Sequence, residues 1–211
     1  MKILALSDKV VPFIYSKQVR SRFNNIDVVI GCGDIPYYYL EYVLTVLNAP
    51  LFYVRGNHDK VLEYGSAGQR THPHGGVDLH RNLCRYENIT FAGIEGSLRY
   101  RPGPFQYSQN QMWLHVFRLV PGMLVNHLTH GRYLDILVTH APANGIHDKD
   151  DLPHQGIKAF RWLLKVFQPA YHIHGHIHIY RPDEPRETIF RATRVINVYS
   201  FNEIKMVFPS E

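Results

Sequence analysis

Short apolar runs alternate with helical patterns along this chain, and several of the runs end directly in a small polar cluster. The runs predict strands at residues 3–6, 28–30, 51–54, 89–92, 136–138, 170–173, 189–198 and 204–208. Helical patterns cover residues 37–47, residues 108–119 with a continuation to about 127, and residues 156–167. Strands that alternate with helices predict an α/β fold, and the two late strands, with little helix between them, favour some antiparallel pairing.

Local signals refine this outline. Ser108 is a candidate cap for the second helix, and Pro121-Gly122 is expected to break or kink it. Residues 97–106 and 141–154 read as loops. The chain has 211 residues and no linker or repeat, which predicts a single domain over residues 1–211.

Composition limits the class of protein. A hydrophobic fraction of 45% and a charged fraction of 19% are those of an ordinary globular chain. The net charge of +5 fits an anionic substrate, whereas nucleic acid is possible but not favoured because the excess is small and evenly spread. With two cysteines, no signal peptide and no membrane-spanning run, the expected location is the cytoplasm. The oligomeric state stays open.

Polar clusters follow five of the predicted strands. They are Ser7-Asp8, Gly33-Asp34, Gly56-Asn57-His58-Asp59, Thr139-His140, and the run from His174 to His178. Because the carboxyl ends of parallel strands line the ligand crevice of an open α/β sheet, these clusters are expected to meet at one site.

The side chains in these clusters are typical metal ligands. Carboxylate, amide and imidazole groups come from Asp8, Asp34, Asn57, His140, His176 and His178. This mixed set suits Mn²⁺, Fe, Zn²⁺, Co²⁺ or Ni²⁺ and is too rich in nitrogen for a dedicated Ca²⁺ or Mg²⁺ site. The set is too large for one tetrahedral ion with an open position, so it predicts two divalent ions that share a bridging carboxylate.

In this order and spacing, the clusters resemble the signature of the calcineurin-like metallophosphoesterase superfamily, from residue 8 to residue 178. The resemblance implies a four-layer sandwich of two mixed β-sheets flanked by helices. It also implies that Asp34 bridges two metals. Asp8 and His178 would hold the first metal, and Asn57, His140 and His176 the second. His58 would be the acid near the leaving group.

The sequence departs from the family pattern at two places. The family's first motif is Asp-x-His, whereas here it reads Asp8-Lys9-Val10, so the first metal loses one expected ligand and the first site should be the weaker one. Phosphoprotein phosphatases carry Gly-Asp-x-x-Asp-Arg-Gly, but Gly33-Asp34 continues as Ile35-Pro36-Tyr37, which counts against that subclass.

The roles of several further residues have two interpretations. Arg99 and Arg101 are candidates for binding substrate phosphate, and so is His154; solvated loop residues are the alternative. Asp59 either orients His58 or caps a helix. His172 and His174 share one face of a strand and read as structural or supporting residues. Residues 37–39, a run of three tyrosines, read as core more than as a substrate platform.

The functional hypothesis from sequence is phosphoester hydrolysis at a dinuclear site, with the ions about 3.5–4 Å apart and a bridging hydroxide as nucleophile. A phosphodiester is slightly favoured over a monoester, because small members of the family often use diesters. The alternatives are a non-catalytic metal-binding scaffold of the same fold, suggested by Val10, and a nuclease, suggested by the basic balance.

Overall fold

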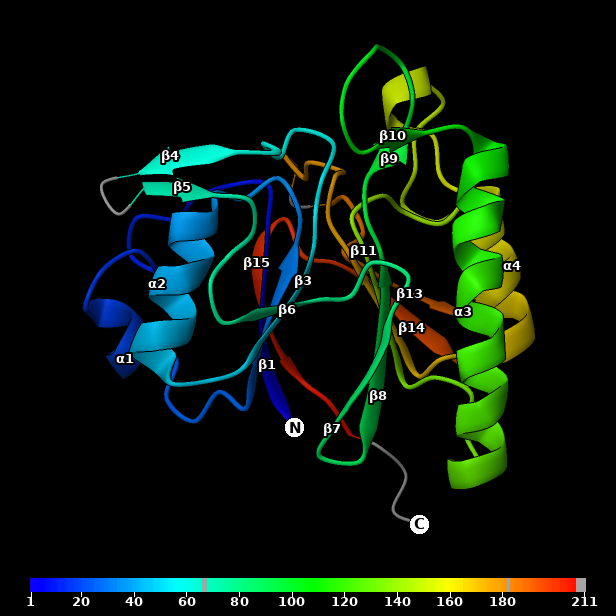
Figure 1. The fold of residues 1–211 in the computed structure, drawn as a ribbon, viewed down its shortest axis with the longest axis horizontal. Helices are drawn as coiled ribbons and strands as arrows, with labels where there is room; N and C mark the ends of the chain where they lie inside the picture. Colours follow the sequence, from blue (N-terminus) through cyan, green and yellow to red (C-terminus); the bar gives the residue numbers. More distant parts are fainter. Residues whose placement is uncertain (66–67, 182, 208–211) are drawn as a thin grey trace.

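Two large β-sheets lie face to face between helices in the computed structural model, which describes residues 1–65, 68–181 and 183–207 (Figure 1). The first sheet has the order β15-β1-β2-β3-β6. Its strands are β1 (Lys2–Ser7), β2 (Val28–Cys32), β3 (Leu51–Val54), β6 (Gly76–Asp78) and β15 (Ser200–Lys205). The first four run parallel, and β15 pairs antiparallel with β1.

The second sheet has the order β13-β14-β12-β11-β8-β7. Its strands are β7 (Leu83–Tyr86), β8 (Ile89–Ile94), β11 (Ile136–Thr139), β12 (Tyr171–His174), β13 (Glu187–Phe190) and β14 (Thr193–Asn197). The four central strands are parallel, and β7 and β13 are antiparallel edges. Two small ribbons add β4 (Glu63–Gly65) with β5 (Gly68–Arg70) and β9 (Ser97–Leu98) with β10 (Gln106–Tyr107).

Alternation along the strands supplies an apolar face on both sides of each sheet. Between the sheets, Ile30 and Val138 belong to one buried cluster, and the rings of Phe52 and Phe91 stack with centroids 4.7 Å apart. The outer face of the first sheet is covered by α1 (Gln18–Arg22) and α2 (Tyr37–Leu47), and that of the second by α3 (Gln109–His130) and α4 (Lys158–Phe167). The expected four-layer sandwich is therefore confirmed (Figure 1).

Two boundary predictions were wrong. Residues 189–198 form the β13–β14 hairpin, because the chain reverses at Arg191, whose φ is +55°. The strand predicted at 204–208 is β15, which begins at Ser200 and ends at Lys205; residue 208 lies outside the described residues. It pairs antiparallel with β1, and β13 pairs antiparallel with β14, so the expected antiparallel pairing of the late strands is confirmed.

Helix α3 is not broken at Pro121-Gly122 but continues to His130. Leu119 and Met123 are buried on either side of the proline, so packing against the sheet stabilises the helix across it. The predicted Ser108 cap is confirmed: its hydroxyl accepts from the Gln111 amide, and the Gln111 side chain returns the bond. No helix in the described ranges is long and apolar enough to cross a membrane.

Candidate metal centre

The polar clusters meet where the carboxyl ends of parallel strands from both sheets come together. Asp8 follows β1 and Asp34 follows β2, whereas His140 follows β11 and His176 lies just after β12. The backbone turns sharply at three of these residues, with φ of +65° at Asp8, +55° at Asp34 and +68° at His176. Left-handed backbone at non-glycine residues clusters at functional sites, because it aims side chains where a regular strand would not.

Two glycines let the loops approach each other closely. A Cβ on Gly56 would overlap Asp34 Oδ1, and a Cβ on Gly175 would overlap Ser7 Oγ. No side chain fits in either position, so the motif glycines are required by the contact between loops of different strands.

Four potential ligand atoms surround one point. His140 Nε2 lies 3.0 Å from Asn57 Oδ1, 3.1 Å from His176 Nδ1 and 3.3 Å from Asp34 Oδ2. Ligand atoms of Asp34, His140 and His176 all lie within 4.8 Å of one another. His140 is fully buried and His176 nearly so. The structure thus brings together all four residues expected to hold the second metal.

Backbone carbonyls fix how the two imidazoles present their nitrogens. His140 Nδ1 donates to the Cys32 carbonyl at 2.8 Å, and His176 Nε2 donates to the Pro153 carbonyl at 2.8 Å. Each ring therefore turns its other nitrogen toward the shared point. Two nitrogen lone pairs 3.1 Å apart repel unless a proton or a cation lies between them. The donor set, two oxygens and two nitrogens, fits a divalent transition metal.

The charges at this point are strongly coupled. Burial acts to raise the pKa of Asp34, but the charge of His140 and its hydrogen bond outweigh burial and lower that pKa to about 2. Burial acts to lower the pKa of His140, but Asp34 raises it to about 9. Burial and the charge of His140 lower the pKa of His176 to about 4. In the metal-free protein, one proton on His140 therefore occupies the position that a cation would take.

The residues expected to hold the first metal are also adjacent. His178 Nε2 lies 3.6 Å from Asp8 Oδ1, and Asp8 also accepts from the His176 amide at 3.0 Å. The Tyr180 hydroxyl contacts His178 Nδ1 at 2.7 Å, which turns Nε2 toward Asp8. Val10 is partly buried and packs against the apolar cluster beneath α1 and α2.

His58 lies beside this centre and contacts the loop between β9 and β10. Its amide donates to Asp34 Oδ1 at 2.7 Å, and its Nδ1 lies 3.2 Å from Arg101 Nη2. Because a guanidinium can only donate, Nδ1 accepts and Nε2 carries the ring proton. That nitrogen lies 3.3 Å from the hydroxyl of Tyr100, which also accepts from Asn57 Nδ2 at 3.3 Å.

Tyr100 was missed by sequence reasoning. Its hydroxyl contacts both His58 and a candidate metal ligand, and its bond to Asn57 Nδ2 leaves Asn57 Oδ1 facing His140. A tyrosine in a loop has no sequence pattern that marks it as functional. Its position between Arg99 and Arg101 was the one feature that could have indicated its role.

The candidate substrate residues lie in different surroundings. Arg101 is next to His58, as described above. Arg99 bonds instead to the Gln106 carbonyl at 3.2 Å and to Gln111 Oε1 at 3.3 Å, so its guanidinium holds the loop. His154 lies near the centre, with its ring centroid 5.4 Å from that of His176. Its Nδ1 bonds to Asp151 at 2.5 Å.

Asp59 ties the motif loops together. One carboxylate oxygen accepts from the Gly56 amide at 2.7 Å and the other from the Ile35 amide at 3.0 Å, which joins the loops after β2 and β3. Burial, reinforced by the charge of Asp34, raises the pKa of Asp59 to about 7. These two bonds reach neither the His58 ring nor the first turn of a helix, so Asp59 fits neither of its two sequence-based roles.

The other histidines of β12 point away from the centre. His172 Nε2 contacts Thr139 Oγ1 at 2.8 Å on the helix-facing side of the sheet. His174 Nε2 contacts His147 Nδ1 at 3.0 Å, and His147 in turn contacts Thr188 at 2.9 Å. These bonds are those of supporting residues, as the alternation along the strand predicted.

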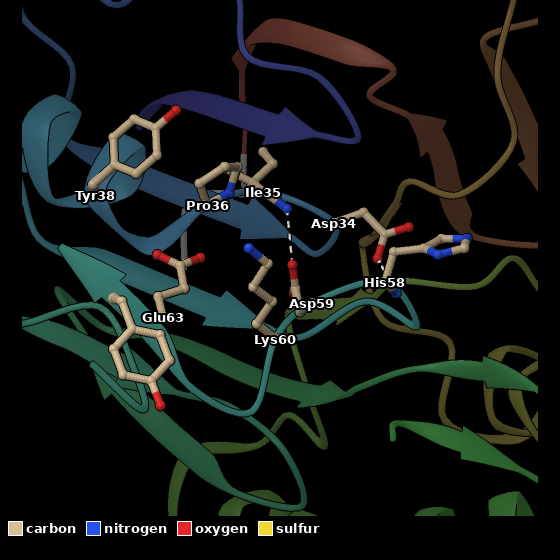
Figure 2. Close-up of a pocket in the computed structure, with 9 residues that line it drawn as sticks. Asp34, Ile35, Pro36, Tyr38, His58, Asp59, Lys60 and Glu63 are labelled. Atoms are coloured by element: carbon tan, nitrogen blue, oxygen red, sulfur yellow. Dashed lines mark hydrogen bonds between the residues drawn. The ribbon is translucent and has the colours of Figure 1, made fainter. Parts of the chain in front are cut away.

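A pocket of about 260 Å³ lies beside His58 and Asp34, between the start of α2 and β4. Figure 2 shows the side chains of Asp34 and His58 at one end of it, pointing away from Tyr38 and Glu63 at the other. Tyr37 and Tyr39 are buried in the core, whereas Tyr38 is 43% exposed at the pocket. The pocket thus offers room for an organic group next to the candidate acid.

Comparison with known proteins agrees with the geometry. The sequence profile of the calcineurin-like phosphoesterase family matches residues 1–180, and the chain belongs to this family. No curated protein matches the sequence.

Solved structures share the fold at low identity. TT1561 of Thermus thermophilus is 16% identical, with a TM-score of 0.61 over 93% of this chain and 88% of that one. A hypothetical protein from the same organism is 13% identical, with a TM-score of 0.51 over 93% of this chain and 75% of that one.

Proposed function

We propose that this chain is a metal-dependent phosphoester hydrolase with a dinuclear centre. The observation that carries the proposal is the convergence of Asp34, Asn57, His140 and His176 on one point, with both imidazoles held in the ligating orientation by backbone carbonyls. A folding role does not require two imidazole nitrogens to face each other beside a carboxylate and an amide oxygen, whereas a cation held by all four groups does.

The ligands divide into two sets around a shared carboxylate. Asn57, His140 and His176 would hold one divalent ion, Asp8 and His178 would hold the other, and Asp34 would contribute to both. When bound, such a pair of ions would supply a hydroxide nucleophile from water and would neutralise charge on the phosphoryl oxygens. Mn²⁺ is one candidate among Mn²⁺, Fe, Zn²⁺, Co²⁺ and Ni²⁺.

The remaining residues act on protons and on substrate. Doubly protonated His58 would donate a proton from Nε2 to the leaving oxygen and return to the neutral imidazole, whose ring Arg101 and Tyr100 hold in place. Arg101 and His154 contact the phosphorylated substrate, and Arg99 supports binding by holding the loop between β9 and β10.

A phosphodiester is the favoured substrate class. A diester carries two organic groups on one phosphate, and the pocket beside His58 has room for one of them while the rest of the substrate stays at the open face of the centre. A monoester carries only one organic group, and stronger cationic contacts to its more highly charged phosphate would be expected.

Replacing the candidate acid tests the proposal. His58→Asn should keep the wild-type metal content and melting temperature but lower turnover of an alkyl-leaving-group phosphodiester by roughly 10²–10⁴. His72→Asn, at an exposed histidine outside the centre, is the matched control and should keep full turnover.

Two outcomes would contradict the proposal in different ways. Wild-type turnover by His58→Asn with a poor leaving group would remove the acid role. If the wild-type protein binds two metals but hydrolyses no phosphoester, the non-catalytic metal-binding scaffold is the correct interpretation.

A further inference from the structure

Helix α3 is apolar on its outer face as well as on the face that packs against the sheet. Its inner side chains, such as Met112, Val116 and Met123, are fully buried. The large exposed side chains are Leu114 (60% exposed), Phe117 (49%), Leu124 (47%), Val125 (59%) and Leu128 (84%). A surface helix ordinarily turns polar side chains to solvent, and one that is apolar all round is covered on all sides. We therefore expect another molecule to cover the outer face of α3.

The apolar face extends onto α4. The ring centroids of Trp113 and Trp162 lie 5.5 Å apart, and the ring centroid of Phe117 lies 5.6 Å from that of Trp162. Val166, one helical turn beyond Trp162, is 47% exposed. Figure 1 shows the two helices together on the outside of the sandwich, and the contacts of Trp113 and Phe117 with Trp162 join their outer faces.

This face is also nearly free of charge. Residues 109–130 contain a single formally charged side chain, Arg118. Depletion of charge with enrichment of large apolar residues is the signature of the core of a protein interface. A helix that binds an anionic lipid surface instead carries several lysines or arginines. The composition of α3 favours a protein partner.

We propose that the partner is a second copy of this chain, joined through antiparallel packing of α3 on α3 about a two-fold axis. The outer residues Leu114, Phe117, Pro121, Leu124 and Leu128 are spaced 3, 4, 3 and 4 apart, which is the seam of an antiparallel helix pair. The pattern is nearly symmetric about Pro121. With the axis there, Leu114 of one copy faces the partner's Leu128, and Phe117 faces the partner's Leu124, so one stripe complements itself.

The available area fits a dimer. A helix of 22 residues is about 33 Å long, and a neighbour 8–10 Å away widens the face to about 20 Å. The product, on the order of 650 Å² per protomer, is close to the roughly 800 Å² that a specific interface of standard size buries on each side.

Sedimentation velocity of the purified full chain tests the association. At tens of micromolar, the wild-type protein should sediment with twice the chain mass of 24.6 kDa. Leu128→Glu and Leu124→Glu should each give monomers with an unchanged melting temperature. Ile189→Glu, at a side chain that is 69% exposed on β13, is the control and should stay dimeric. A monomeric wild-type protein, or a dimer that survives both stripe substitutions, overturns the proposal. So does a monomer that binds lipid vesicles through Leu128.

Cysteine crosslinking tests the antiparallel order. Leu114→Cys combined with Leu128→Cys should form an intermolecular disulfide under mild oxidation. Leu128→Cys alone should not, because the two copies of that residue lie about 21 Å apart along the axis. Equally efficient crosslinking of the single variant contradicts the antiparallel arrangement. Cys84 is partly exposed, so Cys84→Ser is the background for both variants.

Discussion

Tyr100→Phe removes one hydroxyl that contacts two functional side chains. In the structure, this hydroxyl accepts from Asn57 Nδ2 and lies 3.3 Å from His58 Nε2. Phenylalanine keeps the ring and its packing with Arg101 but leaves both groups without this partner. The Asn57 amide then keeps its contact with His140 but loses the partner of its Nδ2, and the His58 ring keeps its bond to Arg101.

The expected loss follows from these two contacts. A hydrogen bond of this kind contributes about 0.5–1.5 kcal/mol net, so losing both costs about 1–3 kcal/mol. That energy corresponds to a decrease in kcat/KM of roughly 5- to 150-fold. Because Asn57 is a ligand of the proposed second metal, the dissociation constant of that metal should also rise, by up to about 100-fold. The melting temperature of the metal-free protein should change little, since Tyr100 lies in a partly exposed loop.

The assay is hydrolysis of an aryl phosphodiester across a metal titration, with metal binding followed independently by calorimetry. Tyr15→Phe is the control, because its ring packs against Tyr38, Tyr39 and Tyr42 away from the ligands. If Tyr100→Phe keeps wild-type kcat/KM and wild-type metal affinity, Tyr100 does not position either residue.

Three further predictions concern the same centre. Arg101→Ala should raise KM and alter the pH profile of kcat, because it frees His58 Nδ1. Arg99→Ala should lower the melting temperature of the protein and change KM only through the loop. Steady-state kinetics of both variants separates the two roles, and an unaltered kcat/KM in both would exclude the loop from substrate binding. The pKa of His140 is raised to about 9, so below that pH a cation must displace a proton from this ring. Calorimetry should therefore show the apparent metal affinity rising about tenfold per pH unit from pH 7 and levelling off near pH 9. A metal affinity that does not depend on pH contradicts this prediction. Metal titration should show two unequal affinities, with Val10→His tightening the weaker one, and two equal affinities unchanged by Val10→His would mean that another residue completes the first site.

The fold and the grouping of ligands were accessible from sequence for a shared physical reason. A strand buried on both faces reads as an apolar run, and the polar residue at its carboxyl end marks the site edge. Asp8, Asp34, Asn57 and His140 were found this way; the structure brings the last three together, and Asp8 bonds the backbone amide of His176 beside them. The hairpin at Arg191 was missed because no glycine, proline or asparagine marks the turn.

Supporting contacts were harder to foresee. Asp59 bonds two amides from different loops, and Tyr100 reaches Asn57 across 43 positions of sequence. Such contacts depend on how loops meet in space, which local pattern does not encode. The continuous path of α3 through Pro121 is of the same kind, because packing on both sides of the proline outweighs its local preference.

The most direct test of the central claim is to measure metal content and phosphodiesterase activity together on one sample. Metal-free protein should be inactive, and activity should appear as the ions are restored, reaching its maximum near two ions per chain. Asp34→Asn, which removes the shared carboxylate charge, should bind at most one ion tightly and lose turnover. Full activity of the metal-free protein, or full metal binding without hydrolysis of any phosphoester, would contradict the account.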